Sequence, residues 1–323
     1  MSEPIISARN LTKYYKSPGL SKKAIPALEQ INLDIFPGEI IALLGPNGAG
    51  KTTFLSILFG LIYPTSGEVL VFSSRPQEKI WKNRAGYVPE HYDPPKFLTG
   101  YELLEIGARV NGLSKNDFLS RLEWLEESLN LKEILNLNIS QYSRGMLQQL
   151  ALAGCFIHNP ELIVLDEPTA NLDALSRKKL QELLWEMAQA NKTILISSHI
   201  LSELEELCNR VILIDKGKII QQGYIKDLLT SDGGYTICFK DFTAIPESLN
   251  ALGNINYDPK LEIAYLETRT EYEKDRAVKI LTENEISIEF IEPKQKTLEE
   301  YFLEILEQKE LEKYFLKITE EGK

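Results

Sequence analysis

The segment from Gly45 to Thr52 carries the most specific chemical pattern of the sequence. It reads Gly-Pro-Asn-Gly-Ala-Gly-Lys-Thr and matches the phosphate-binding pattern G-x-x-x-x-G-K-[ST]. Glycines let consecutive backbone N–H groups turn inward around phosphate oxygens, beside a helix N-terminus that favours anions. Lys51 adds a positive charge near the terminal phosphates, and the Thr52 hydroxyl can ligate Mg²⁺.

The alternative is a glycine-rich turn that binds nothing. A strand-like run before the motif and a helix-compatible segment after it favour the nucleotide site instead. We therefore expect nucleotide binding by Gly45, Pro46, Asn47, Gly48, Ala49, Gly50, Lys51, Thr52 and Thr53.

Two carboxylates, Asp166 and Glu167, follow the apolar run 162–165. If that run is a buried parallel strand, both lie at the carboxyl edge of the sheet, where α/β proteins bind ligands. We assign Asp166 to Mg²⁺ coordination through water. Glu167 is then the expected group to orient or deprotonate the attacking water. Without the phosphate loop, a solvated acidic pair at a strand end would be the better interpretation.

His199 follows a second strand-like run, residues 193–196, and would reach the same edge. A lone histidine is usually structural, so position alone leaves its role open.

The elements that position these residues can be read from the hydrophobic pattern. The runs 40–44, 162–165 and 193–196 are apolar on both faces, as in central strands of a covered parallel sheet. Residues 28–35 alternate apolar and polar side chains, which predicts a half-exposed antiparallel strand. Helical patterns separate the apolar runs, so the sequence predicts an α/β fold.

Residues 97–150 predict a helical insertion. Thr99 with Glu102 forms a capping-box pattern, and Ser114 with Asp117 indicates a second helix start. Leu119, Leu122, Leu125 and Leu129 follow at the three-to-four spacing of a helix.

Residues 211–223 predict a hairpin around Lys216 and Gly217. From about residue 224 no phosphate-type motif appears. Strand-like segments at 237–242, 261–267 and 286–292 and a helix-like segment at 275–285 predict a small α+β unit. A final helix from Thr297 follows.

The composition is that of a globular protein. The 323 residues suggest about two domains, and 43% hydrophobic and 26% charged residues exclude wholesale disorder. The net charge of −11 argues against binding nucleic acid mainly by phosphate neutralisation, so we expect no nucleic-acid partner.

Three scattered cysteines, without a C-x-x-C pair, exclude a zinc ribbon and a disulfide scaffold and fit a reducing cytosol. We find no signal-peptide pattern and no uncharged stretch of the ~18 residues that a membrane-spanning helix needs. We expect a protein that does not cross a bilayer by itself.

The segment Tyr142–Gln149 resembles the signature of ATP-binding cassette (ABC) proteins. The other motifs stand in the order of an ABC nucleotide-binding domain over residues 5–223. They are the adenine-stacking aromatic (Tyr15), Walker A (45–52), the Q-loop (Gly86–Glu90), Walker B (162–167), the D-loop (Asn171–Asp173) and the switch histidine (His199). Through this resemblance, His199 is expected to be functional.

Two departures refine the resemblance. Glu90 stands in place of the usual Gln, and Arg144 and Met146 occupy signature positions while Ser143 and Gly145 are retained. Both resemble the branch of ABC exporters whose ATPase and permease are separate chains. The segment 297–302 resembles the helix that ends many of its ATPases.

The resemblance implies a P-loop (RecA-like) parallel sheet with an antiparallel β subdomain and a helical subdomain at about 97–150. It places an ATPase domain at 1–223. The extension at 224–323 is expected to be either a regulatory or dimerisation domain or a packing appendage of the ATPase domain, because an amphipathic helix serves either use. The ATPase would bind ATP and Mg²⁺ in a head-to-tail dimer, either a homodimer or a heterodimer with a second ABC ATPase. Ser143, Gly145 and Asp173 would add nucleotide contacts, and Glu90 would serve the metal and catalysis.

The resemblance also implies a location and a partner. The ATPase would work at the cytoplasmic face of the membrane with a polytopic permease, whose substrate the sequence does not name. The main alternative is a soluble ABC ATPase acting on ribosomes or DNA. A single cassette, the acidic balance and the lack of a long heptad run disfavour it. A P-loop kinase is disfavoured by the signature and by the Asp166–Glu167 pair.

Overall fold

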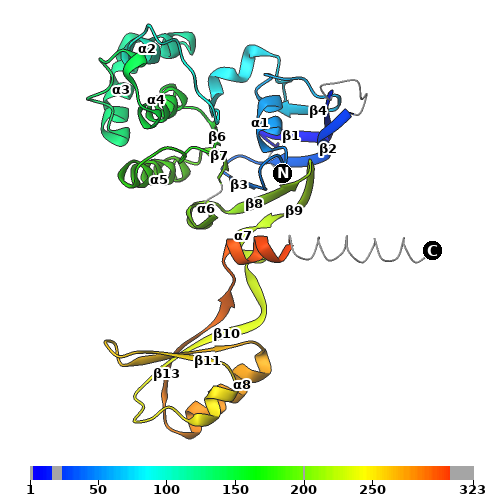
Figure 1. The fold of residues 1–323 in the computed structure, drawn as a ribbon, viewed down its shortest axis with the longest axis vertical. Helices are drawn as coiled ribbons and strands as arrows, with labels where there is room; N and C mark the ends of the chain where they lie inside the picture. The colour runs from blue at the N-terminus through cyan, green and yellow to red at the C-terminus, as the bar shows by residue number, and fades with distance from the viewer. Residues whose placement is uncertain (1–2, 17–23, 199–200, 306–323) are drawn as a thin grey trace, which may run out of the picture. The chain divides into compact units, whose positions relative to one another are not determined.

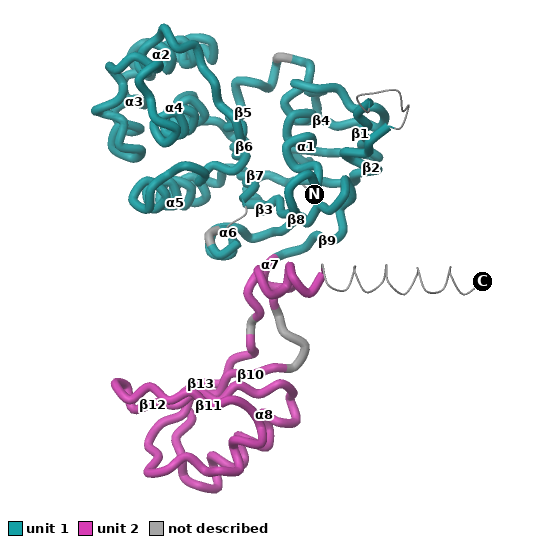
Figure 2. Tube along the Cα trace, viewed as in Figure 1, with its two compact units in different colours: residues 1–224 teal, residues 225–323 magenta. Residues whose placement is uncertain are grey.

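The computed structural model describes residues 3–16, 24–198 and 201–305 (Figure 1). The chain divides into two compact units, residues 1–224 and 225–323 (Figure 2). Among the described residues, no helix combines the length and the apolar character needed to cross a membrane.

A six-stranded sheet lies at the centre of the first unit, in the order β5-β6-β7-β3-β8-β9. The first five strands in this order are parallel, and β9 runs antiparallel to β8. Every residue of β3, β6 and β7 is buried, which confirms the predicted central strands. The strands are β3 (Ile40–Leu44), β5 (Ala85–Val88), β6 (Leu162–Asp166), β7 (Thr193–Ser197), β8 (Arg210–Asp215) and β9 (Lys218–Tyr224).

A three-stranded antiparallel sheet, β2-β1-β4, accompanies the central sheet. Ile31, Leu33 and Ile35 of β2 are buried while Asn32 is exposed, which confirms the half-exposed strand. The strands are β1 (Ile6–Lys16), β2 (Ala24–Ile35) and β4 (Ser66–Val71). Their buried side chains share one core with helix α1 (Lys51–Leu58) and with β3.

The predicted helical insertion is present, grouped apart from β1, β2 and β4 in Figure 1. Its elements are α2 (Gly100–Val110), α3 (Lys115–Leu129), the short 3₁₀ helix Ile139–Gln141 and α4 (Arg144–Phe156). Thr99 and Glu102 form the predicted capping box, and the Ser114 hydroxyl caps α3. Leu122, Leu125 and Leu129 of the predicted leucine series form a buried stripe on α3. Phe118, two per cent exposed, begins the stripe, and Leu119 lies further round the helix and is 43% exposed.

The first unit also contains the helices α5 (Ala174–Gln189) and α6 (Leu201–Leu207) and the 3₁₀ helix Lys79–Arg84.

The second unit is a four-stranded antiparallel sheet in the order β11-β12-β10-β13. Helix α8 and its neighbours cover a core around Phe239, Leu266 and Leu281. The strand β11 was not predicted, because its sequence Asn-Ile-Asn-Tyr-Asp lacks an apolar run. The elements are α7 (Ile225–Leu228), β10 (Thr230–Lys240), the 3₁₀ helix Glu247–Ala251, β11 (Asn254–Asp258), β12 (Ile263–Thr268), α8 (Glu271–Glu283) and β13 (Ser287–Gln295). A last helix begins at Leu298 and is described to residue 305.

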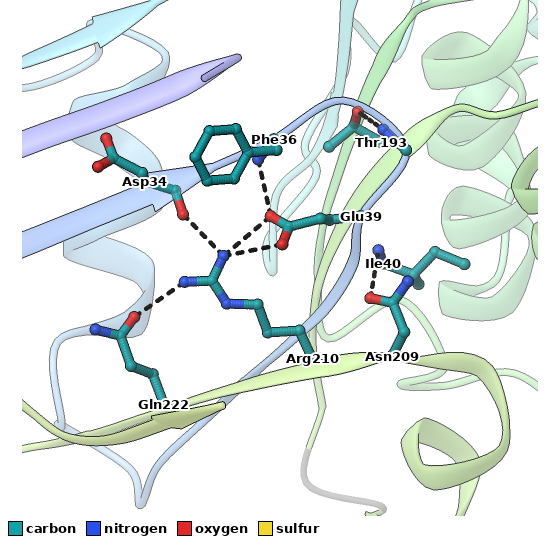
Figure 3. A network of polar contacts seen from close by, with 9 residues as sticks. Asp34, Phe36, Glu39, Ile40, Thr193, Asn209, Arg210 and Gln222 are labelled. Atoms are coloured by element: carbon teal, nitrogen blue, oxygen red, sulfur yellow. Dashed lines mark hydrogen bonds and ion pairs between the residues drawn. The ribbon is translucent and has the colours of Figure 1, made fainter. Parts of the chain in front are cut away.

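An ion pair between Glu39 and Arg210 joins the two sheets of the first unit (Figure 3). The Arg210 guanidinium donates to both Glu39 carboxylate oxygens, at 3.1 and 3.0 Å, and to the Asp34 carbonyl at 2.9 Å. Glu39 also accepts the Phe36 N–H at 2.8 Å, and Arg210 reaches Gln222 on β9 at 3.1 Å. The Arg210 side chain is only 14% exposed and the Glu39 side chain only 10%. The network therefore ties the end of β2 to the starts of β3 and β8.

We predict that Arg210→Met destabilises the first unit by about 3–5 kcal/mol, because Glu39 is left buried without its cation. All three tryptophans, Trp81, Trp124 and Trp185, lie in residues 1–224, so tryptophan fluorescence in denaturant follows this unit. The control Arg109→Met removes the exposed pair with Glu105 and should cost about 0.5 kcal/mol or less. If the two variants lost the same free energy of unfolding, the stabilising role of the Glu39–Arg210 pair would be contradicted.

Candidate nucleotide-binding site

The predicted phosphate loop joins β3 to α1. Gly50, the residue before α1, has φ 112°, a conformation that side chains rarely adopt. A Cβ there would lie 2.4 Å from the Ala27 carbonyl oxygen of β2, so the position accepts only glycine. The loop thus meets the N-terminus of α1 close against β2, with backbone N–H groups available at the helix start.

Lys51 is held in the loop. Its Nζ donates to the Gly45 carbonyl oxygen at 2.6 Å, and the residue is 8% exposed. The ammonium group therefore lies within the loop whose N–H groups would cradle phosphates.

Asp166 ends β6 and is buried. One carboxylate oxygen, Oδ1, accepts the Ser197 hydroxyl at 2.6 Å. The other, Oδ2, is buried and accepts no hydrogen bond from the described residues. Burial raises the pKa of Asp166, and the charge of Glu90 raises it further. The hydroxyls of Ser197 and Thr52 and the charge of Lys51 oppose that shift.

An unpartnered buried carboxylate oxygen beside a threonine hydroxyl suits a hard cation. No cluster of three or more His, Cys, Asp or Glu side chains that could hold a metal occurs in the described ranges. Mg²⁺ does not require one, because it is usually held by one or two carboxylates together with substrate phosphates. The residues present therefore fit Mg²⁺ bound with a nucleotide.

Glu167 has a left-handed backbone conformation, with φ 52°. Its N–H donates to Ser197, to the hydroxyl at 3.0 Å and to the carbonyl at 3.1 Å. A non-glycine residue held in this region is strained, and such strain clusters at functional sites. The contact with β7 turns the chain sharply where it leaves β6.

One cavity of about 820 Å³ collects most of the predicted residues. It is lined by the phosphate loop from Pro46 to Thr53 and by Glu90, Asp166 and Glu167. Asn171 of the predicted D-loop also lines it. Residues without a predicted role there complete the lining: Ile25, Pro26, Ala27, His91, Arg144 and Ala170. In the sequence Arg144 is only a departure from the usual signature, and nothing in the pattern predicts its place in this cavity.

Tyr15 lies next to this cavity. It pairs with Ile25 across β1 and β2, and directly paired residues project from the same face of a sheet. The ring is 42% exposed, with the Lys13 ammonium 5.2 Å from its centroid. An exposed aromatic face beside a cavity-lining residue is available for stacking.

Ser143, Gly145 and Asp173 do not line the cavity. Ser143 caps α4, and its hydroxyl accepts the Met146 N–H at 3.2 Å. Asp173 caps α5 and accepts the Ser176 N–H at 2.9 Å; this bond, first among several, lowers the pKa of its carboxyl. A Cβ on Gly145 would lie 3.0 Å from the Asn171 carbonyl oxygen, so the two segments are neighbours. His199 lies outside the described residues.

Comparison with known proteins gives this arrangement a family. The ABC transporter family model matches residues 28–170. The chain is 34% identical over 235 residues to an ABC transporter ATP-binding protein of Nostoc sp., covering 72% of this chain and 70% of that one. It is 35% identical to the ABC transporter ATP-binding protein NatA of Bacillus subtilis, covering 65% and 87% of the two chains.

Solved structures agree. An ATP-binding subunit of an ABC transporter aligns with a TM-score of 0.63 and 28% identity, covering 69% of this chain and 91% of that chain. A dimeric ATP-binding cassette in a post-hydrolysis state, bound to ADP and phosphate, aligns with a TM-score of 0.62 and 26% identity, covering 68% and 98%. The family predicted from the signature and its companion motifs is confirmed. The chain belongs to the ATP-binding proteins of ABC transporters.

Proposed function

We propose that this protein is the ATP-hydrolysing subunit of an ABC exporter and that it drives a separate membrane permease. The observation that carries the proposal is the single cavity that joins the phosphate loop, Asp166, Glu167 and Glu90. Relatives named for export or transport support the direction. They are a Nod factor export protein of Cupriavidus metallidurans, 34% identical, and the bacitracin transport protein BcrA of Bacillus licheniformis, 36% identical.

The alternative of a soluble ABC ATPase on ribosomes or DNA is less well supported. The relatives described above are ATP-binding proteins of transporters, and the net charge of −11 disfavours contact with nucleic-acid phosphates.

In this proposal ATP binds with its phosphates in the loop and its adenine against Tyr15. Thr52, Asp166 and Glu90 would hold Mg²⁺, and the bound ion would supply positive charge beside the terminal phosphates. Lys51 balances further phosphate charge. Arg144, which lines the same cavity, adds another cation.

Glu167 is proposed to orient the attacking water and accept its proton. Glu167 is the first residue beyond β6, so its carboxylate lies at the carboxyl edge of the sheet. The contacts with Ser197 fix its backbone. His199 follows β7 along the chain and is proposed to assist at the γ-phosphate.

Hydrolysis is proposed to require two cassettes arranged head to tail. Ser143, Gly145 and Asp173 of one chain would complete the phosphate site of the other, in a homodimer or a heterodimer. The caps on α4 and α5 support this, because they fix the backbone of both segments for a partner. ATP then joins the subunits, and its hydrolysis releases them.

The permease is proposed to dock on the helical insertion, at the cytoplasmic face of the membrane. Phe97 before α2 is 79% exposed, and Ile106 and Val110, one turn apart on α2, are 47% and 81% exposed. Large apolar side chains in such number on one short segment favour a protein partner. The second unit, residues 225–323, is proposed to be a regulatory or dimerisation extension.

Glu167→Gln should bind ATP but hydrolyse it about 10²–10⁴ times more slowly, since the amide cannot accept the proton of water. It should also persist as an ATP-bound dimer in sedimentation. Glu182→Gln, on the exposed face of α5, is the control and should behave as wild type. Near-normal turnover by Glu167→Gln would remove Glu167 as the base.

Ser143→Arg should leave ATP binding by the monomer intact and abolish the ATP-dependent dimer, because a bulky cation would replace the hydroxyl at the interface. Ser114→Arg is a matched control. Ser114 caps α3 as Ser143 caps α4, each accepting an N–H at 3.2 Å, so the two variants lose equivalent caps. If sedimentation with ATP shows dimers of Ser143→Arg, Ser143 does not contact the nucleotide of the other chain.

Affinity purification of tagged Glu167→Gln from detergent-solubilised membranes with ATP should recover a polytopic membrane protein. The double variant Ile106→Glu/Val110→Glu should lose it, because two charges replace the apolar face of α2. The control Leu119→Glu, at an exposed apolar side chain of α3, should retain the membrane protein. Recovery of ribosomal proteins or DNA without a membrane protein would instead favour the soluble alternative.

A further inference from the structure

The turn between β8 and β9 closes the outer side of the phosphate loop. Lys216 and Gly217 both have positive φ, 49° and 78°, as in a tight hairpin turn. The Gly217 N–H donates to the Ala49 carbonyl oxygen at 2.9 Å, and the Gly217 carbonyl accepts the Glu29 N–H of β2 at 2.8 Å. One turn residue therefore bonds to the loop on one side and to β2 on the other.

Two further contacts fix this turn. Lys218 forms an ion pair with Glu29 at 3.0 Å. A Cβ on Gly217 would lie 2.8 Å from the Ala27 carbonyl oxygen and 3.0 Å from the Leu28 Cα, both backbone atoms that cannot rotate away. The Ala27 carbonyl also blocks a side chain on Gly50, so the turn and the end of the loop press against the same peptide of β2.

The hydrogen bond to Ala49 has a chemical consequence. A backbone cradle for phosphate needs its N–H groups inward and its carbonyl oxygens outward, because an inward carbonyl would repel the anion. Three loop carbonyls find partners in the loop or in α1: Gly45 with Lys51, Pro46 with Ala49, and Gly50 with Phe54. The Ala49 carbonyl takes its partner from the β8–β9 turn, far along the chain.

We propose that Gly217 is a positioning residue for ATP binding: its N–H holds the Ala49 carbonyl outward and keeps the empty phosphate loop in its binding conformation. The proposal rests on ATP binding at residues 45–52. Without the bond, the empty loop spends part of its time in other conformations, and the apparent affinity falls by the fraction lost. Bound phosphates then restore the loop, so the chemical step is unaffected.

The test is Gly217→Ala. Its Cβ would force the turn away from β2 and break the bond to Ala49. We expect the KM for ATP to rise about tenfold, the effect of one net hydrogen bond, with kcat within about twofold of wild type. Amide hydrogen exchange at residues 47–50 should be faster than in the wild type without ATP and equal to it at saturating ATP.

Gly112→Ala is the matched control. Gly112 has φ 82°, close to that of Gly217, and a Cβ there would meet nothing within 4 Å. It lies in the turn after α2, so it carries the same backbone strain without contact with the phosphate loop. If both variants change the KM by the same factor, or if Gly217→Ala lowers kcat at unchanged KM, the proposal is overturned.

Lys218→Gln keeps the proposal testable if Gly217→Ala does not fold. The Lys218 side chain is 63% exposed, and its loss removes only the pair with Glu29. We expect a rise in KM of about twofold, from the weak restraint that an exposed ion pair provides; an unchanged KM would overturn the proposal in that case. If no form of the protein hydrolyses ATP, the ATPase proposal fails. The effect of Gly217 on affinity is then tested by comparing the Kd of each variant for a fluorescent ATP analogue.

Discussion

The largely buried pair of Glu39 and Arg210 fixes the start of β3, and the phosphate loop begins only five residues later. Because β3 is buried on both faces, a shift at its start would reappear at its end. The pair joins the antiparallel sheet to the parallel sheet at the edge opposite the cavity. Its hydrogen bonds are satisfied, so it can serve as a rigid reference for the loop.

The carboxyl edge of the sheet has the opposite character. There Asp166 keeps a buried oxygen without a partner among the described residues, and Glu167 is held in a strained conformation. Both features cost stability, and a fold tolerates them where the surrounding structure determines them. The central sheet therefore separates an edge braced by the Glu39–Arg210 network from an edge whose groups are completed by a ligand.

The sequence predicted most of the parallel sheet and the loop, because the pattern of these residues is local: apolar runs, glycines and caps within a few positions. It did not predict β11, whose residues are mostly polar, or the burial of Phe118. The places of Ile25, His91 and Arg144 in the cavity, and the bond from Gly217 to Ala49, depend on contacts between distant segments. The prediction for His199 stays a prediction.

Residues 230–295 of the second unit begin and end close together. The Lys296 N–H donates to the Leu229 carbonyl at 3.0 Å, and β10 and β13, which follow and precede these residues, are neighbours in the sheet. A segment whose two ends meet can be inserted into a chain, or removed from it, without displacing what flanks it. Residues 230–295 thus have the anatomy of a module that can be exchanged as one piece, with the residues before Thr230 and the helix from Leu298 left in place.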